Sequence, residues 1–580
     1  MIKPLAVLAC ASLALAAPAQ QPFSVPGPST SNVTLPAGPR KLHGRFLHIT
    51  DMHPDPYYKT GTSESTACHR KKPRKEKTRA EPWGTPHGDC DSPFRLTNRT
   101  LKWLEKHWAD EIDFVVWTGD NARHDNDRRL PRTLKEIYML NGEVASKMQS
   151  IFTKRGIPVV PSLGNNDVWR EFSRSTHAGP NDIISKFASI WRPFIPFPSY
   201  QVFQRGAYYS VEVIPNQVAV IALNTMYFYD SNKAVGGCEY SEPHDPGNLQ
   251  LDWLEVQLQI FRERGMHVRS PGHVPPSVDN YFPECHVRYA ELALRYQDTI
   301  LGHLFGHMNN DHFFFIEALN LEFPPEDDVR IRAHDGLYDD LLDDFGRVRR
   351  DKARDEADYA VVNVSPSVVP NPLLPSFRIF SYNITGAKHL DADSALKKNK
   401  KKHHRGDGGP EKGDRFEKCK NGGGDGWRCH LDKPWHSSPD APSRTNTLWS
   451  PLGYAQVRAF NFMLRWECML DANLHGSQYY LPPGSLSNAT EKPKFKLEYM
   501  TYELDALHPA DGSAGPIPKK ELPKSLRKRT KKNASSKFAP YGLPDLTVGS
   551  WLALADKLGG SGAKKVKKRF RKYMFMGGED

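Results

Sequence analysis

Five short motifs of acidic, histidine and asparagine residues stand out because their side chains can bind metal ions. They are Asp51-Met52-His53, Gly119-Asp120-Asn121, Gly164-Asn165-Asn166-Asp167, Gly272-His273 and Gly306-His307. Carboxylate, imidazole and amide oxygen donors suit zinc, manganese, iron, cobalt or magnesium, and no thiolate is needed. One motif alone is weak, because a single Gly-Asp often forms a turn in which the Asp caps a helix. Five of them in one chain predict a metal centre.

The elements that must position these side chains are apolar runs with the pattern of buried strands. These runs lie at 45–50, 113–118, 157–163, 207–213, 217–224 and 299–305. Helical patterns alternate with them, at 96–111, 133–152 and 248–265. The alternation indicates a layered α/β domain. Ligands of open α/β sheets gather at the carboxyl ends of strands, so the motifs are expected to converge.

The order of the motifs, DxH, GD, GNxx, GHxPP and GHxx, resembles the calcineurin-like metallophosphoesterase family over about residues 45–320. Within that family the chain is similar to the acid sphingomyelinase-like branch. The segments 375–386, 452–456, 546–558 and 573–578 resemble the fungal vacuolar endopolyphosphatases more closely. The resemblance implies an α/β fold, a four-layer β-sandwich flanked by helices, with disordered basic insertions.

The resemblance also implies a site for two divalent ions, which would be manganese, magnesium, cobalt, zinc or iron. Two such ions, roughly 3.5–4 Å apart, activate water and hold phosphoryl oxygens for in-line attack. Asp120 would bridge the ions and so take part in catalysis. The other implied ligands are Asp51 and His53 for the first ion, and Asn165, His273 and His307 for the second.

Asn309 stands where the family usually has a second histidine that binds the first ion. An amide oxygen is a neutral and weaker donor, so looser binding and more tolerance of magnesium, manganese or cobalt are expected. The alternative is a catalytically dead relative. Endopolyphosphatases resemble this chain in having a GHxN-type motif, which favours a working site with Asn309 as a ligand.

His124 lies four residues after Asp120, where the sphingomyelinase-like branch has a leaving-group acid or a phosphate-binding donor. The resemblance therefore implies a catalytic role for His124, and a surface histidine on a loop is the alternative. Asn166 replaces a phosphate-contacting histidine of that branch. This replacement weakens the lipid phosphodiester interpretation, because a polyphosphate fragment leaves readily as an anion without an acid.

The N-terminus predicts entry into the secretory pathway. Residues 1–19 combine Lys3, an apolar run and small residues, which is typical of a signal peptide. The run of about 14 residues is short for a bilayer span of roughly 20, and an uncleaved signal anchor is the alternative. Glycosylation is predicted at Asn32, Asn98, Asn383, Asn488 and Asn533. A further sequon at Asn363 is weakened by Pro366.

Seven cysteines lie outside the signal, and in an oxidising compartment most of them are expected to pair, with one left over. Three local pairings are suggested, Cys68 with Cys90, Cys238 with Cys285 and Cys419 with Cys429. Other connectivities remain open. None of the cysteines has the CxxC spacing of a zinc finger, so structural disulfides are favoured.

The chain of 580 residues carries a net charge of +12, which favours a polyanionic partner such as nucleic acid, anionic lipid or polyphosphate. Its composition suggests a division into six segments. These are the signal at 1–19, a linker at 20–44, a core at 45–390 with a charged insertion at 325–358, a low-complexity basic insertion at 391–415, a C-terminal part packing on the core at 416–510, and a basic tail at 511–580.

The resemblance implies an endopolyphosphatase that hydrolyses internal phosphoanhydride bonds of long-chain inorganic polyphosphate in the vacuole. The alternatives are a secreted sphingomyelinase-like phosphodiesterase, a catalytically weak polyanion-binding protein and a secreted nuclease. Residues 20–44 have no room for the saposin-like domain that the phosphodiesterase predicts. No specific nucleic acid partner is expected. Association with the vacuolar membrane and the oligomeric state stay open.

Overall fold

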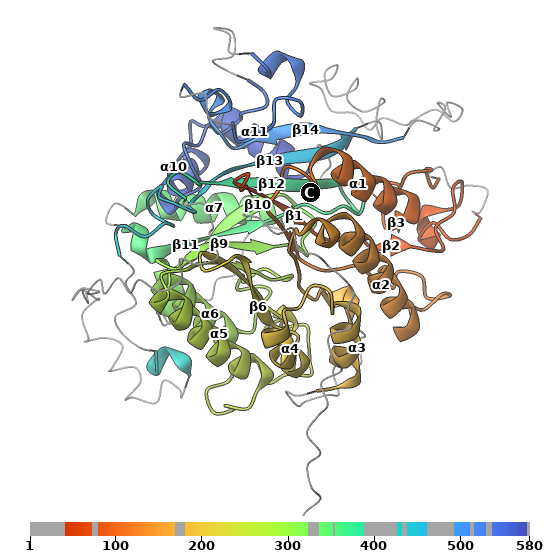
Figure 1. Ribbon diagram of the computed structural model, residues 1–580, viewed down its shortest axis with the longest axis horizontal. Coiled ribbons are helices and arrows are strands. Elements are labelled where there is room, and N and C mark those ends of the chain that lie inside the picture. Colours follow the sequence, from red (N-terminus) through yellow and green to blue (C-terminus); the bar gives the residue numbers. More distant parts are fainter. Residues whose placement is uncertain are drawn as a thin grey trace, which may run out of the picture. The chain divides into compact units, whose positions relative to one another are not determined.

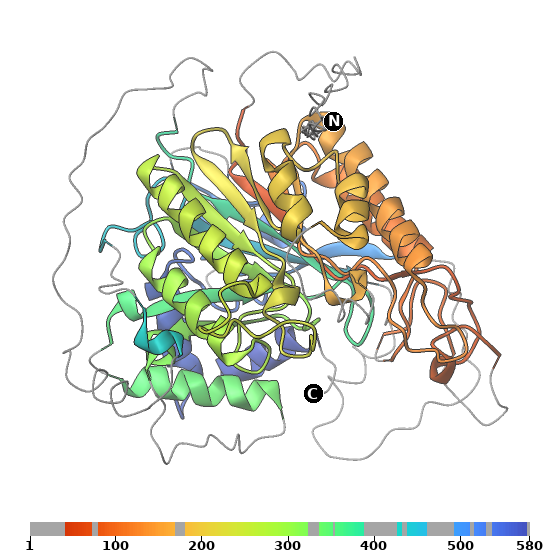
Figure 2. The ribbon, with the colours of Figure 1, turned by 90° about the horizontal axis from the view of Figure 1, so that it is seen from below.

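The protein is described by a computed structural model over residues 41–71, 79–86, 88–168, 180–322, 336–351, 354–387, 426–431, 438–460, 492–510, 515–528 and 536–576. Within these residues the chain forms two six-stranded sheets and one two-stranded sheet. Helices flank the sheets (Figures 1 and 2). The predicted fold class, an α/β sandwich flanked by helices, is confirmed.

The first sheet has the strand order β14-β13-β12-β1-β4-β5. Its strands are β1 (Arg45–Ile49), β4 (Phe114–Trp117), β5 (Val159–Pro161), β12 (Ser376–Tyr382), β13 (Pro451–Phe460) and β14 (Lys494–Met500). Strand β1 pairs in parallel with β4 and antiparallel with β12, with Arg45 opposite Ser381. The chain that follows the predicted low-complexity insertion therefore supplies two strands of the sheet that carries the first metal-binding motif.

The second sheet has the order β10-β11-β9-β8-β7-β6. Its strands are β6 (Tyr209–Ile214), β7 (Val218–Ala222), β8 (His267–Pro271), β9 (Ile300–Phe305), β10 (His312–Glu317) and β11 (Tyr359–Val364). Strands β7, β8, β9 and β11 run parallel, and β6 and β10 are antiparallel edges. The two sheets meet through their inner faces, where the guanidinium of Arg269 in β8 lies 4.6 Å from the ring centroid of Phe46 in β1.

Three of the described helices form at the predicted helical patterns of 96–111, 133–152 and 248–265, with small differences at their ends, and the others lie outside those patterns. The helices are α1 (Phe94–His107), α2 (Leu134–Ile151), α3 (Asp182–Ile190), α4 (Tyr200–Gly206), α5 (Pro246–Glu263), α6 (Pro283–Arg295), α7 (Leu337–Arg350), α10 (Val548–Gly559) and α11 (Lys564–Met574). Helix α1 ends four residues before its pattern, because the chain turns at the buried Trp108. Helix α7, within the predicted charged insertion, buries Phe345 and packs on α10.

Two disulfides join Cys68 with Cys90 and Cys238 with Cys285, as predicted. Cys429 is also disulfide-bonded, but its expected partner Cys419 lies outside the described residues, as does Cys468. The short strands β2 (Pro54–Asp55) and β3 (Ser92–Pro93) pair beside the first disulfide.

Several sequence predictions concern residues outside the described part of the chain. They are the signal at 1–19, most of the linker at 20–44, the basic insertion at 391–415, and the sequons at Asn32, Asn488 and Asn533. Asn98 and Asn383 are half-buried, and Asn363 is buried in β11. Among the described helices, none combines the length and the apolar character required to cross a bilayer.

Candidate metal centre

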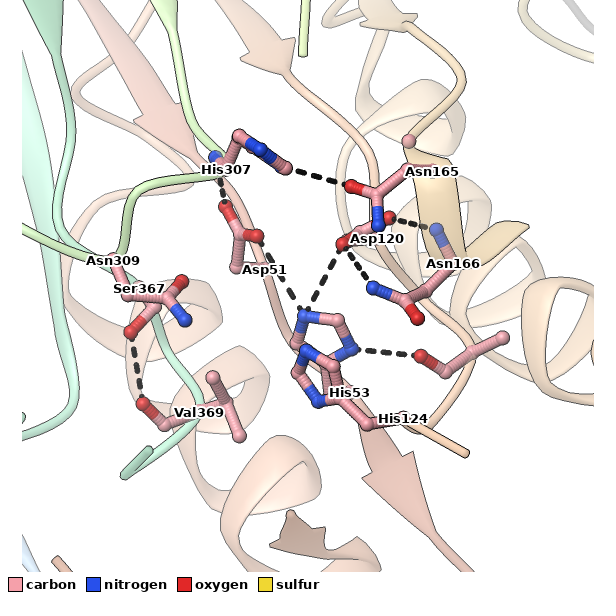
Figure 3. A network of polar contacts seen from close by, with 12 residues as sticks. Asp51, His53, Asp120, His124, Asn165, Asn166, His307, Asn309, Ser367 and Val369 are labelled. Atoms are coloured by element: carbon pink, nitrogen blue, oxygen red, sulfur yellow. Dashed lines mark hydrogen bonds and ion pairs between the residues drawn. The ribbon is translucent and has the colours of Figure 1, made fainter. Parts of the chain in front are cut away.

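Side chains from five loops meet beyond the carboxyl ends of strands from both sheets. Figure 3 labels those from four of the loops, Asp51 and His53, Asp120, Asn165, and His307. Asp51 and His53 follow β1, Asp120 follows β4, Asn165 begins a 3-10 helix after β5, His273 follows β8, and His307 follows β9. The structure therefore brings together the residues that the sequence motifs singled out. The carboxylates and His53 and His273 are almost fully buried.

Asp120 occupies the middle of the group. Its Oδ2 lies 3.4 Å from Nε2 of His53 and 3.2 Å from Nε2 of His273. On the first side, Nε2 of His53 is 3.6 Å from Oδ1 of Asp51. On the second side, Oδ1 of Asn165 is 2.9 Å from Nε2 of His273 and 2.8 Å from Nδ1 of His307. One carboxylate oxygen thus faces two separate sets of donor atoms.

Three buried polar atoms in this group have no hydrogen-bond partner among the described residues. They are Oδ1 of Asp51, Nε2 of His53 and Oδ1 of Asn309. Asn309 belongs to the same loop as His307, whose backbone N–H donates to Oδ2 of Asp51 over 3.0 Å. Leaving such atoms unsatisfied is unfavourable by about 1–3 kcal/mol each, more for charged groups. A divalent cation would satisfy the Asp51 and His53 atoms, which lie 3.6 Å apart, so these residues fit the metal that the motifs predict.

Backbone carbonyl groups fix the ring orientation of His53 and His273. Nδ1 of His53 lies 2.7 Å from the carbonyl oxygen of Ala122, and Nδ1 of His273 lies 2.7 Å from that of Thr118. A backbone carbonyl accepts the Nδ1 proton, which leaves Nε2 free to act as a metal ligand.

The pocket favours positive charge. Burial lowers the pKa of His53, but the nearby carboxylates of Asp51 and Asp120 outweigh it and raise that pKa to about 9. Burial also lowers the pKa of His273, but the negative charge of Asp120 outweighs it and raises that pKa to about 9. Burial would raise the pKa of Asp120, yet His273 and His53 hold it well below its usual range. The negative charge of the buried Asp120 carboxylate therefore attracts cations.

The backbone of this site is held in an unusual conformation. Positive φ angles occur at Asp51 (49°), His53 (37°), Asp120 (56°), His307 (72°) and Asn309 (57°). Residues with a Cβ atom rarely adopt this left-handed region, and such strain gathers at functional sites. Backbone hydrogen bonds between the loops retain it, including those from Asp51 N–H to the Gly119 carbonyl and from His53 N–H to the Asp120 carbonyl.

Two motif glycines are needed for the loops to approach each other. A Cβ on Gly164 would lie 2.0 Å from Oδ1 of Asp120, and one on Gly306 would lie 2.0 Å from Oγ1 of Thr50. Any side chain there would push a ligand-bearing loop away, so the glycines allow the close contact that the motif spacing predicts.

Asp167 organises the loops behind the site, a role that the sequence did not reveal. Its buried carboxylate accepts backbone N–H bonds from Asp120 (2.8 Å), Asn121 (2.7 Å) and Gly164 (3.1 Å), and a side-chain N–H bond from Asn141 (3.0 Å). The loops after β4 and β5 are thereby fastened to one another. Only its place in the Gly164–Asp167 motif could have signalled this.

His124 lies beside the group rather than within it. Its ring stacks on that of His53, with centroids 4.0 Å apart and planes inclined by 24°. Nδ1 of His124 is 2.7 Å from Oδ1 of Asp91, and the His124 backbone N–H donates to Oδ2 over 2.6 Å. One quarter of the His124 side chain is exposed, so solvent and substrate can reach it. Asp91 was missed in the sequence because no metal-binding motif surrounds it.

Comparison with known proteins places this site in a family. Residues 44–311 match the calcineurin-like phosphoesterase family. An endopolyphosphatase of Cryptococcus neoformans var. neoformans is 38% identical over 92% of this chain and 91% of that protein. The Yarrowia lipolytica endopolyphosphatase is 37% identical over 61% of this chain and 57% of its own length. That of Saccharomyces cerevisiae is 44% identical over 47% and 41%. The chain belongs to the endopolyphosphatase family of calcineurin-like phosphoesterases.

Proposed function

We propose that this protein is a metal-dependent endopolyphosphatase, a hydrolase that cleaves internal phosphoanhydride bonds of long-chain inorganic polyphosphate. The observation that carries the proposal is the position of Asp120, whose Oδ2 lies within 3.4 Å of donor atoms from both sheets. The similarity to one fungal endopolyphosphatase over nine tenths of the chain supports the substrate.

Two sets of side chains would hold the two ions, with Asp120 shared between them. The first set is Asp51, His53, Asp120 and Asn309, and the second is Asp120, Asn165, His273 and His307. When bound, two divalent ions supply a nucleophile from water near neutral pH and neutralise charge on the phosphoryl oxygens. These oxygen and nitrogen donors, without thiolate, suit manganese, magnesium, cobalt, zinc or iron.

His124 is proposed to donate a proton to the leaving oxygen, and Asp91 would hold its ring in place through the 2.7 Å contact. A polyphosphate fragment leaves as a stabilised anion and gains little from this proton. An alkoxide leaving group depends on it strongly. A His124→Asn variant should therefore lose more activity on an alkyl phosphodiester than on polyphosphate.

The net charge of +12 supports a polyanionic substrate. We place the protein in the vacuole, in the lumen or on the lumenal side of the membrane. The Cys68–Cys90 and Cys238–Cys285 disulfides support an oxidising route of this kind. Glycosylation at Asn98 and Asn383 remains part of this proposal.

Chain-length analysis on a gel tests the proposal directly. Purified protein is incubated with long-chain polyphosphate and cobalt, manganese, magnesium or zinc, with a chelator as control. Metal-dependent shortening to intermediate lengths, abolished in Asp120→Asn, is the expected result. Survival of long chains with every metal would refute the activity, and binding of intact chains would then indicate a polyanion-binding protein.

A further inference from the structure

Arg132 is a buried cation at the edge of the metal centre, only 4% exposed. Its Nη1 donates to the carbonyl oxygens of Arg123 (2.6 Å) and Asn166 (2.7 Å), and to Oδ1 of Asn166 (3.2 Å). Asn166 in turn donates its backbone N–H and its Nδ2–H to the two oxygens of Asp120, each over 2.8 Å (Figure 3). The guanidinium of Arg132 is therefore two hydrogen bonds away from the central carboxylate.

The other edge of the Arg132 guanidinium is unpaired. Its Nε is buried and has no hydrogen-bond partner among the described residues. In that part of the chain Arg132 also forms no ion pair, whereas Arg123, which is equally buried, pairs with Glu136. Asp125 accepts a hydrogen bond from the backbone N–H of Arg132, over 3.0 Å, rather than from its guanidinium. The carboxylates of Asp120, Asp125 and Asp167 are close enough to act on the charge of Arg132, but none of them accepts a hydrogen bond from its guanidinium. A buried Nε–H without an acceptor is unfavourable, which indicates that an acceptor group completes the site.

The carboxylates near Arg132 already accept hydrogen bonds from other groups. Asp167 accepts backbone N–H bonds from Asp120, Asn121 and Gly164. Asp120 receives both bonds from Asn166 and faces the two sets of metal-binding atoms. A phosphoryl group would supply both the negative charge and the paired acceptor oxygens that the flat edge of a guanidinium matches.

We propose that Arg132 binds a phosphoryl group of the polyphosphate chain beside the dinuclear centre through its Nε edge, while its Nη1 holds Asn166 against Asp120. The proposal rests on the proposed function, because the ligand is the substrate of that same site. An internal bond has further phosphates on both sides, whereas a terminal bond lacks them on one side. A cation that binds a neighbouring phosphate thus favours internal cleavage.

The test is calorimetric titration of the metal-loaded protein with orthophosphate and with tripolyphosphate. Arg132→Gln and Arg132→Lys are compared with wild type, and the metal content of each sample is measured by elemental analysis. Arg129→Gln, an exposed arginine of the same loop, is the matched control for loss of one charge. The expected result is about 10- to 100-fold weaker phosphate binding in Arg132→Gln at unchanged metal content, with Arg132→Lys intermediate.

Two results would overturn the proposal. One is phosphate affinity in Arg132→Gln and Arg132→Lys equal to that of wild type. The other is loss of metal from both variants with normal phosphate affinity once metal is restored, because Arg132 would then act only through Asn166. Failure of the proposed function is a separate observation: wild-type protein would bind phosphate through Arg132 and leave polyphosphate intact.

Discussion

The side-chain amide of Asn309 donates to the carbonyl of Asn371 over 2.9 Å and leaves its own Oδ1, which is buried, without a hydrogen-bond partner among the described residues. Under the proposed assignment this oxygen is the neutral ligand of the first ion. Asn309→Ala should lower apparent metal affinity about 10- to 100-fold, in the range found for residues that support metal ligands.

Activity measured against free manganese, cobalt, magnesium and zinc reads out this affinity, with Asn310→Ala as the control on the same loop. Asn309→His should tighten binding and shift the preference toward zinc, because imidazole suits that ion. Equal metal requirements in wild type and Asn309→Ala would show that Asn309 is not a ligand.

Asp167 should be the residue behind the site on which stability depends most. Asp167→Ala removes an acceptor from N–H groups of Asp120, Asn121 and Gly164 and leaves them buried. We expect the free energy of unfolding to fall by about 2–4 kcal/mol, with activity reduced because the Asp120 loop loses its anchor. Urea unfolding gives the measurement, and Asp182→Ala, an exposed carboxylate at the start of α3, is the control. A change no larger than in the control would contradict the prediction.

His69 predicts a pH dependence of stability. Its Nε2 lies 2.7 Å from Asp55 and its Nδ1 2.9 Å from Asp127, which also pairs with Arg70. Burial lowers the pKa of His69, but the hydrogen bonds to Asp55 and Asp127 outweigh it and the pKa is raised above 6.5. A raised folded-state pKa stabilises the protein fully below that of the unfolded chain, and the contribution is lost as pH rises through the folded-state value.

Denaturant unfolding of wild type and His69→Gln at a series of pH values checks this sign. The stability difference between the two proteins should be largest at acidic pH and should shrink toward alkaline pH. The prediction would be wrong if the difference grew with pH or stayed constant.

Helix α11 predicts a salt-dependent contribution to substrate affinity. Lys564, Lys565 and Lys568 are exposed on it, and the carbonyl oxygen of Met574 at its end accepts from Asp311 N–H, two residues after Asn309. Changing the three lysines to Gln should weaken binding of long polyphosphate and reduce the slope of log affinity against log salt by about 2. Tripolyphosphate, too short to span helix and site together, should be unaffected.

Fluorescence anisotropy of labelled polyphosphate at several salt concentrations measures the slope. The control replaces three exposed lysines elsewhere, Lys102, Lys135 and Lys154, by Gln. An equal loss in both triple variants would mean that α11 contributes only to net charge.

The convergence of the candidate metal ligands was predictable because each motif follows a strand, and strand ends determine where side chains meet. Asp51, Asp120 and His307 are placed by β1, β4 and β9 in this way. The strand before His273 was missed, since His267–Pro271 carries the buried cation Arg269, whose guanidinium packs on Phe46 of the opposite sheet. Such packing is a tertiary property that no local pattern records.

The supporting residues were not predictable for a related reason. Asp91, Arg132 and Asp167 make their contacts across loops, to His124, Asn166 and Asp120. Their importance follows from which backbone groups they satisfy, and this depends on the completed fold. The sequence alone could show that these residues are polar, and little more.

The pairing of β1 with β12 has a consequence for how the protein is made. Arg45 lies opposite Ser381. On its other edge β12 pairs with β13, which in turn pairs with β14, and β14 ends at Met500. The loop after β1 is therefore synthesised early, whereas the strands β12, β13 and β14 beside it are synthesised late. Pairings so distant in sequence also slow folding. A chain still under synthesis should therefore carry no activity until β12, β13 and β14 have been added to the sheet.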